Sequence, residues 1–217
     1  PEDPANMNAM ERRASATLSS IFALRMLGLF LVLPVFALEA RKYPGGDDPA
    51  MIGLAMGIYG LTQGILQIPF GIASDKFGRK PVIILGLLVF AFGSVWAGCA
   101  DNLQSLLVGR ALQGAGAVSA AVTAMLADLT RDVVRTKAMA LVGASISLMF
   151  ALSLVISPWL AGWIGLSGLF FLTAVLALGG MAVVRWSVPD EPYKLDPSDR
   201  SGLAEVVRDS GLIRLNF

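Results

Sequence analysis

Long apolar segments separated by short charged ones are the dominant pattern of this sequence. Segments almost free of charge lie between Asp48 and Asp75, Lys80 and Asp101, Asp101 and Asp128, and Lys137 and Arg185. Only Arg110 interrupts the third of them. A helix needs about 20 apolar residues to cross a bilayer, and the fourth segment has room for two crossings and a tight turn. The pattern therefore predicts a series of membrane-spanning helices.

Six spans are predicted from these segments and from the apolar run near the N-terminus. Their approximate ranges are Ala14–Leu38, Pro49–Ser74, Pro81–Ala100, Leu103–Ala127, Ala138–Ile164 and Leu166–Trp186. Pro34 is expected to bend the first span. A soluble helical bundle would need amphipathic stripes, whereas these runs are apolar on all sides. The predicted fold class is an all-α membrane protein with six transmembrane helices.

Basic residues predict the orientation and the division of the chain. Thirteen lysines and arginines lie on the side of the N-terminus, whereas the opposite side holds only Arg41 and Lys42. Cytoplasmic loops carry an excess of basic residues, so both termini are predicted to be cytoplasmic. Residues 1–13 would form a cytoplasmic N-terminus, 14–188 the transmembrane bundle and 189–217 a cytoplasmic linker. That linker is expected to hold a short amphipathic helix over Ser201–Ser210 and, in LIRLNF, the start of a missing seventh span.

The composition of the chain excludes several kinds of binding site and catalytic site. Hydrophobic residues make up 55% of the 217-residue chain and charged residues 15%, against about a quarter in soluble domains. There is no histidine and Cys99 is the only cysteine, which excludes an intrachain disulfide and any His-based metal site, proton relay or catalytic triad. The net charge of +1 says little about partners, and no basic patch suggests a nucleic-acid partner. We expect no metal, no other cofactor and no enzymatic activity.

The turn GIASDKFGRKP, after the second predicted span, is rich in charged residues, whereas the apolar segments on either side have almost none. Gly78 is open to a positive φ, which a tight reversal needs, and Pro81 suits the first turn of the next helix. Gly71 would let a neighbouring helix approach closely. Asp75 and Arg79 lie four residues apart and would face the same way in a helix. An ordinary cytoplasmic loop anchored by basic residues is the alternative.

Two arginines interrupt predicted spans. A charge inside a span costs at least a few kcal/mol, so Arg25 and Arg110 should face a partner or a wet cavity, or else bond backbone carbonyls as structural arginines. Arg25 is followed by Gly28, and Arg110 by Gly114. This faint repeat indicates that the six spans form two three-helix sets, an arrangement expected of secondary transporters.

The second span carries two stripes. Tyr59, Gln63 and Gln67 follow an i, i+4 spacing that suits a water-filled cavity, or hydrogen bonds to a neighbouring helix. Gly53, Gly57, Gly60 and Gly64 form a second stripe, which suits helix packing. Met26, Met149 and Phe150 would supply adaptable apolar walls to the cavity.

The turn resembles the loop signature G-x-L-A-D-R-x-G-R-K of the major facilitator superfamily. The matching positions are Gly71, Asp75, Gly78, Arg79 and Lys80, while Ala73, Ser74 and Lys76 depart from the pattern. The resemblance implies a conformational latch. In it the aspartate faces a helix N-terminus of the second half of the transporter, and the arginine pairs with an acid at the cytoplasmic end of span four, here Asp128.

Two further segments resemble motifs of exporters in this superfamily. LLVGRALQGAGAVSAA is similar to L-x-x-x-R-x-x-Q-G-x-G-A-A of proton-driven drug exporters, with matches at Leu106, Arg110, Gln113, Gly114, Gly116 and Ala117. SLVISPWLAG is similar to the antiporter motif G-x-x-x-G-P-x-x-G-G at Pro158 and Gly162, where a kink and close packing are implied. Ser153, Ser157 and Ala161 replace its other glycines. The stretches GIYGLTQ, QIPFG, RALQGAGA and ADLTR look most similar to the YajR-type exporters of the family.

The resemblance covers essentially the whole chain as the N-terminal six-helix half of a twelve-span secondary transporter. It implies efflux of a small amphipathic compound in exchange for protons, across a bacterial-type inner membrane. The partners implied are the lipid bilayer, the small-molecule substrate and a C-terminal half missing from this chain. Cavity candidates are Arg25, Met26, Tyr59, Gln63, Arg110, Gln113 and Met149. A uniporter or importer of the same fold, and a non-transporting membrane module, remain alternatives.

Overall fold

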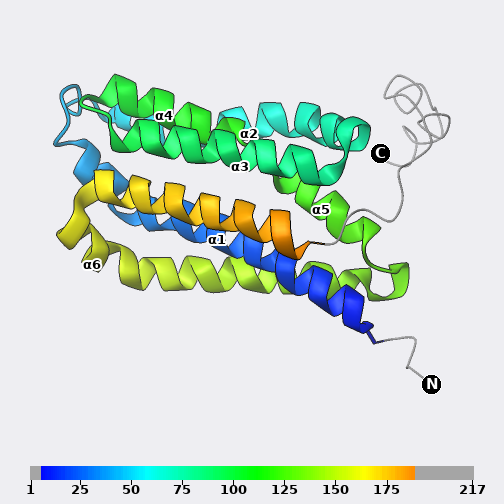
Figure 1. Cartoon of the computed structure of the whole chain (residues 1–217). Coiled ribbons are helices and arrows are strands. Elements are labelled where there is room, and N and C mark those ends of the chain that lie inside the picture. Colours follow the sequence, from blue (N-terminus) through cyan, green and yellow to red (C-terminus); the bar gives the residue numbers. More distant parts are fainter. Residues whose placement is uncertain (1–5, 189–217) are drawn as a thin grey trace, which may run out of the picture.

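The computed structural model describes residues 6–188 and shows an all-helical bundle (Figure 1). Its helices are α1 (Ala9–Ala40), α2 (Pro49–Phe77), α3 (Arg79–Gly98), α4 (Leu103–Ala115), α5 (Ser119–Asp128) and α6 (Asp132–Ser187). The amphipathic helix and the seventh span predicted within 189–217 lie outside the described residues. Within 6–188 no strand occurs.

Local signals in the sequence account for most helix boundaries. Asn8 caps α1 in a capping box with Glu11, whose backbone N–H donates to the Asn8 side chain. Asp48 caps α2 just before Pro49, and Asn102 caps α4. Gly78 alone separates α2 from α3, and its φ of 100° and ψ of 150° is a conformation that a residue with a Cβ rarely adopts. The predicted role of Gly78 in this reversal is confirmed.

Within residues 6–188, five segments are long and apolar enough to cross a membrane: α1, α2, α3, α4 together with α5, and α6. α6 has 56 residues, which would reach about 84 Å if straight, more than two bilayer cores. Its backbone leaves helical geometry at Gly165, where φ is 66°. Figure 1 shows that the chain reverses there, so α6 consists of two antiparallel limbs. The break falls between the predicted fifth and sixth spans.

The sequence predicts one continuous span over Leu103–Ala127, but the structure has two helices there. α4 ends at Ala115 and α5 begins at Ser119, with Gly116 at φ −77° and ψ 56° between them. Non-helical backbone at membrane depth is tolerated only where it is buried in protein or lines a cavity. Gly116 is buried here. By contrast, α1 stays one helix through Pro34, and α6 keeps helical geometry through Pro158.

The helices gather in two groups (Figure 1). α2, α3 and α4 lie together, and α1 lies with the two limbs of α6. α3 joins the groups by packing against α6. Small residues allow close contact, as where a Cβ on Gly28 of α1 would come within 2.8 Å of Thr173 in α6. Some helices that are consecutive in sequence pack together only weakly: α1 makes few contacts with α2, whereas α3 packs against α4.

The two ends of the bundle differ in charge. One end of the bundle, named here the basic end, holds the first and last described residues, the α2–α3 turn and the start of α6 (Figure 1). Basic residues at this end include Arg12, Arg13, Lys76, Arg79, Lys80, Arg131, Arg135, Lys137 and Arg185. The 41–48 loop, the α3–α4 turn and the reversal at Gly165 lie at the opposite end (Figure 1). The two main apolar clusters pack near the two ends, and a polar network occupies the layer between them.

Candidate functional site

Arg25 of α1 is buried in the middle of the bundle, with 1% of its surface exposed. Its Nη2 donates to the Tyr59 hydroxyl at 3.0 Å and to the Gly116 carbonyl at 3.1 Å. The guanidinium also lies over the Phe90 ring, 5.0 Å from its centroid. A desolvated cation over an aromatic face gains about 2 kcal/mol or more. Neutral acceptors and a ring thus hold this charge.

Arg110 of α4 is equally buried. Its Nη1 donates to the Gln113 side-chain oxygen at 2.9 Å, and its Nε donates to the Ala55 carbonyl at 3.4 Å. The rings of Tyr59 and Phe36 lie 5.0 and 5.5 Å from the guanidinium carbon. Each arginine thus bonds both a side-chain partner and a backbone carbonyl, which combines two of the predicted arrangements.

Tyr59 joins the two arginines into one network, because its hydroxyl accepts from Arg25 while its ring faces Arg110. The network continues from Gln113 to Ser94, at 2.8 Å, and from the Ser94 hydroxyl to the Phe90 carbonyl. Side chains from α1, α2, α3 and α4 therefore meet in one layer. Among the residues that the structure describes, no carboxylate bonds either arginine.

The predicted cavity residues lie at different depths in the structure. Arg25, Tyr59, Arg110 and Gln113 lie inside the bundle rather than on an open face. Their chemistry explains this, since most of their polar groups find protein partners there, whereas Nε of Arg25 is buried without a hydrogen bond within the described residues. The other candidates, Met26, Gln63 and Met149, are half-buried. The Gln63 side-chain oxygen is buried without a hydrogen bond in the described part of the chain.

The helix break at Gly116 has a role in this network. The Gly116 carbonyl faces Arg25, and the nearby Ser119 hydroxyl lies 3.5 Å from Nη1 of the same arginine. A Cβ at Gly116 would lie 2.4 Å from the Gly86 carbonyl of α3, and one at Gly114 would lie 2.2 Å from the Tyr59 carbonyl of α2. The two glycines of the motif thus bring α4 against its neighbours.

The α2–α3 turn places three oxygen-bearing side chains around Arg79, which is only 9% exposed. Its Nε donates to Asp128 of α5 at 3.0 Å, Nη1 donates to the Ser74 hydroxyl at 2.7 Å, and Asp75 forms an ion pair with Nη1. Both carboxylates are about half-exposed, so each pair contributes about 1 kcal/mol or less. The arrangement can bias two conformations more readily than it can hold the fold together.

Other predicted positions differ in their contacts. Lys80 donates to the carbonyl of Val188 at the end of α6, at 3.0 Å. A Cβ on Gly71 would meet only Ala120, at 3.8 Å, so the close approach expected there is not required. Nothing in the described chain lies within 4 Å of a Cβ on Gly162, so the packing expected there is not made with residues 6–188. Pro158 is exposed and its helix is unbroken, so it is not the point where the chain turns.

The glycine stripe of α2 also packs against nothing in the described chain. Added Cβ atoms at Gly53, Gly57, Gly60 and Gly64 would have no neighbour within 4 Å. The face that these residues form is exposed in the described part of the chain. The four glycines do form a stripe on α2, but no helix within residues 6–188 packs against it.

A buried ion pair at the basic end was not predicted. Glu11, which precedes the apolar run of α1, is 2% exposed, and its carboxylate accepts from Nε and Nη2 of Arg131 at 2.8 and 3.0 Å. The Arg131 side chain, against the opposing effect of burial, lowers the pKa of Glu11 to about 2. The pair ties the start of α1 to the start of α6.

Several residues of these sites carried no strong signal in the sequence. Ser74, Ser94 and Ser119 are small hydroxyl residues in apolar segments, where most serines bond their own helix carbonyls. Ser74 appeared only as a departure from the loop signature. Glu11 and Arg131 are 120 positions apart, and only the fold brings them together. Within the described residues, no group of three or more His, Cys, Asp or Glu could hold a metal ion.

Comparisons with known proteins decide the family. Residues 18–215 match the sequence profile of the Major Facilitator Superfamily. The inner membrane transport protein YajR of Escherichia coli (strain K12) is 45% identical over 215 residues, which are 97% of this chain and 47% of YajR. This chain belongs to the major facilitator superfamily. The family and the names of its curated relatives are those of transporters rather than enzymes.

More distant members of the superfamily give the same result. Multidrug resistance protein 2 of Bacillus subtilis (strain 168) is 33% identical over 205 residues, 91% of this chain and 48% of that protein. The crystal structure of the human organic anion transporter MFSD10 (TETRAN) matches with a TM-score of 0.73 at 20% identity, over 86% of this chain and 50% of that chain. This last likeness shows the fold alone. The chain spans about half the length of the curated relatives it matches.

Proposed function

We propose that this chain is the N-terminal six-helix half of a secondary transporter that exports small amphipathic compounds in exchange for protons. The observation that carries the proposal is the cluster of Asp75, Arg79 and Asp128 at the α2–α3 turn. In a member of this superfamily, such a cluster suits a latch that favours one of two conformations. Resistance proteins among the relatives support efflux as the direction of transport.

The membrane disposition follows from the same features. When the two limbs of α6 are counted separately, the chain crosses the membrane six times. We group these crossings into two sets of three. α1 and α4 then occupy equivalent positions in the two sets, as do Arg25 and Arg110. Trp159 and Trp163 are 64% and 77% exposed near the opposite end, and Trp186 is 78% exposed near the basic end. Tryptophan is enriched at both membrane surfaces. We place the basic end on the cytoplasmic side of a bacterial-type inner membrane. The name of YajR, an inner membrane transport protein, supports this membrane.

A second six-helix half is the proposed partner. The relatives are about twice as long as this chain, and the exposed glycine face of α2 offers a surface for close helix packing. The substrate would bind between the two halves near the bilayer midplane. The buried network of Arg25 and Arg110 would then shape the wall behind that site rather than contact the substrate directly.

Transport can be tested in proteoliposomes that hold either the 217-residue chain alone or a longer protein in which it is joined to a second six-helix half. We expect drug efflux driven by an imposed pH gradient only for the longer protein. Asp75→Asn should lower the flux by up to about fivefold, the factor that corresponds to about 1 kcal/mol. Asp47→Asn, the same change in the exposed loop at the opposite end, is the matched control and should leave the flux within about twofold of the wild type.

The other outcomes separate the alternatives. Flux that persists without the proton gradient would identify a uniporter, and accumulation of the compound on the cytoplasmic side would identify an importer. No flux of any tested compound by the longer protein would favour a non-transporting module. Equal effects of Asp75→Asn and Asp47→Asn would contradict the latch.

A further inference from the structure

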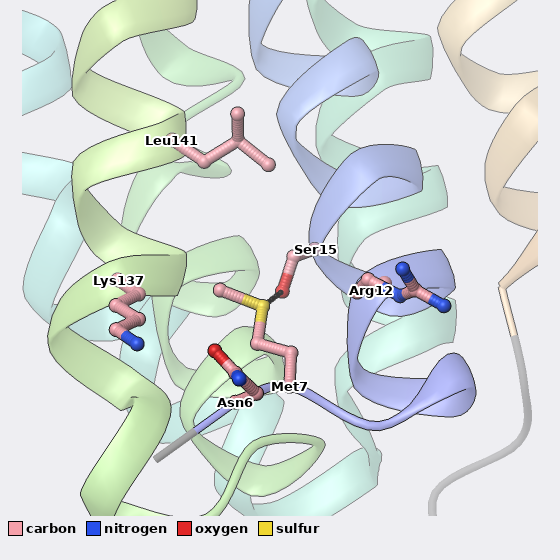
Figure 2. Close-up of a pocket in the computed structure, with 6 residues that line it drawn as sticks. All are labelled: Asn6, Met7, Arg12, Ser15, Lys137 and Leu141. Atoms are coloured by element: carbon pink, nitrogen blue, oxygen red, sulfur yellow. Dashed lines mark hydrogen bonds between the residues drawn. The ribbon is translucent and has the colours of Figure 1, made fainter. Parts of the chain in front are cut away.

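A cavity of about 660 Å³ opens at the basic end, between the beginning of α1 and the beginning of α6 (Figure 2). Its lining consists of Asn6, Met7, Arg12, Ser15, Lys137 and Leu141. No residue of the arginine network or of the α2–α3 turn belongs to this lining. The cavity is therefore separate from the sites to which transport was assigned.

The cavity lies where the charged ends of two helices give way to their apolar runs. The apolar runs of the two helices that form it begin at Ala14 and Ala138. Lys137 is the last charged residue before the second run, and Leu141 lies one helical turn, about 5.4 Å, further in. Polar groups thus surround the mouth, while Leu141 continues into an apolar surface.

The charges around the mouth favour an anion. Lys137 points its ammonium group toward Asn6 at the mouth (Figure 2). The guanidinium of Arg12 points away from the other lining side chains, but it is exposed and no described residue pairs with it, so a rotation can bring it in. The N-termini of α1 and α6 add their positive dipole ends.

Among the described residues, the acids nearest the cavity are already paired. Glu11 is held by Arg131, and Asp132 forms an ion pair with Arg135 at 2.6 Å. Their negative charges are therefore offset and do not repel an incoming anion. Met7 and the stem of Lys137 supply apolar wall on either side of Ser15, whose hydroxyl is turned toward the Met7 sulfur at 3.8 Å.

We propose that this cavity binds the phosphate group of an anionic phospholipid such as phosphatidylglycerol. Lys137 and Arg12 contact the phosphate, and an acyl chain runs along Leu141 and the exposed apolar face of α6. Basic pockets at the cytoplasmic ends of transmembrane helices are suited to lipid headgroups. Free phosphate shares the headgroup chemistry but leaves the apolar wall unused. The proposal stands independently of what the protein transports.

Charge is tested by native mass spectrometry of the delipidated 217-residue protein titrated with phosphatidylglycerol. We expect Lys137→Gln to weaken binding about fivefold, and the double change with Arg12→Gln to weaken it about 25-fold. Arg13→Gln removes the same charge from the neighbouring position, which does not line the cavity, and should change the affinity less than about twofold. Equal losses for Arg12→Gln, Arg13→Gln and Lys137→Gln would show diffuse attraction to the basic end and overturn the site.

The shape of the cavity is tested without altering charge. Leu141→Trp fills the cavity and should weaken phosphatidylglycerol binding about tenfold, the loss expected when an acyl contact of about two methylene groups is blocked. Leu148→Trp lies two turns further along α6, on its exposed face, and is the matched control. Unchanged binding by Leu141→Trp would place the lipid elsewhere.

The source of the phosphate is tested by competition. Neither 10-fold molar excess of phosphatidylethanolamine nor millimolar inorganic phosphate should displace phosphatidylglycerol, because the first is zwitterionic and the second has no acyl chain. Displacement by inorganic phosphate that depends on Lys137 would identify a free-phosphate site and overturn the lipid assignment. Displacement by phosphatidylethanolamine would show that headgroup charge is not recognised.

Discussion

At the scale of single residues, the central feature is that two buried arginines share one tyrosine. The hydroxyl of Tyr59 satisfies Arg25, while its ring lies against Arg110. Removing a partner from a buried charged donor costs more than removing a neutral hydrogen bond, because the charge is left without solvation. The two functions of Tyr59 can be separated, since phenylalanine keeps the ring and removes only the hydroxyl.

Tyr59→Phe is expected to lower the free energy of unfolding by about 1.5–3 kcal/mol, the range for hydrogen bonds to charged groups. Tyr43→Phe is the matched control, because it removes a hydroxyl that bonds only the neutral Ser167, at 3.2 Å. That change should cost about 0.5–1.5 kcal/mol. Thermal unfolding of the purified protein in detergent compares the two. A Tyr59→Phe midpoint equal to or above that of Tyr43→Phe would contradict the role given to the hydroxyl.

At the scale of helices, glycines of similar appearance do different things. Gly114 lies where α4 crosses α2, with no space for a methyl group. Gly57 lies on the open face of α2, where a methyl group meets nothing within the described residues. Close helix contact in a bilayer depends on such small residues, whereas an exposed glycine only weakens its helix.

The same substitution at these two positions should therefore have opposite effects. In the 217-residue chain, Gly114→Ala should destabilise the fold by about 1–3 kcal/mol, as overpacking does. Gly57→Ala should be neutral or stabilise it by up to about 1 kcal/mol through helix propensity. Thermal unfolding midpoints in detergent provide the measurement. Destabilisation by both changes to the same extent would mean that the two glycines pack alike, against the structure.

At the scale of the whole molecule, the fold places the two charge-rich sets of loops at opposite ends. The α2–α3 turn and the start of α6 share the basic end with the start of α1, so any two of them lie on the same side of a membrane (Figure 1). The loop of residues 41–48 lies at the other end. A single labelling experiment can therefore decide the orientation of the entire bundle.

In a Cys99→Ala background, a cysteine at Asp47 should react with an impermeant maleimide added to intact cells. A cysteine at Asp132 should react only after the membrane is permeabilised, because its end of the bundle carries the basic excess. Asp132 suits the comparison since its side chain is 85% exposed. The reverse pattern of labelling would invert the proposed topology.

Much of the site could be predicted from the sequence because some signals are local. Gly78 between two helices and the acid–base spacing of Asp75 and Arg79 indicated a structured turn. The residues that complete the network could not be found in the same way. Ser94 and Ser119 look like any serine in an apolar helix, and Glu11 meets Arg131 only across the fold.

By itself, the sequence determined the helical class, the positions of the apolar segments and the side on which basic residues gather. These properties follow from transfer of each segment between water and lipid, which depends on composition along the chain. Only the tertiary structure decided that Arg25 and Arg110 are buried inside the bundle, that the fourth span breaks at Gly116 and that α1 packs with α6. Each of these depends on which groups from distant segments meet, because a buried charge or a freed carbonyl is stable only beside a suitable partner.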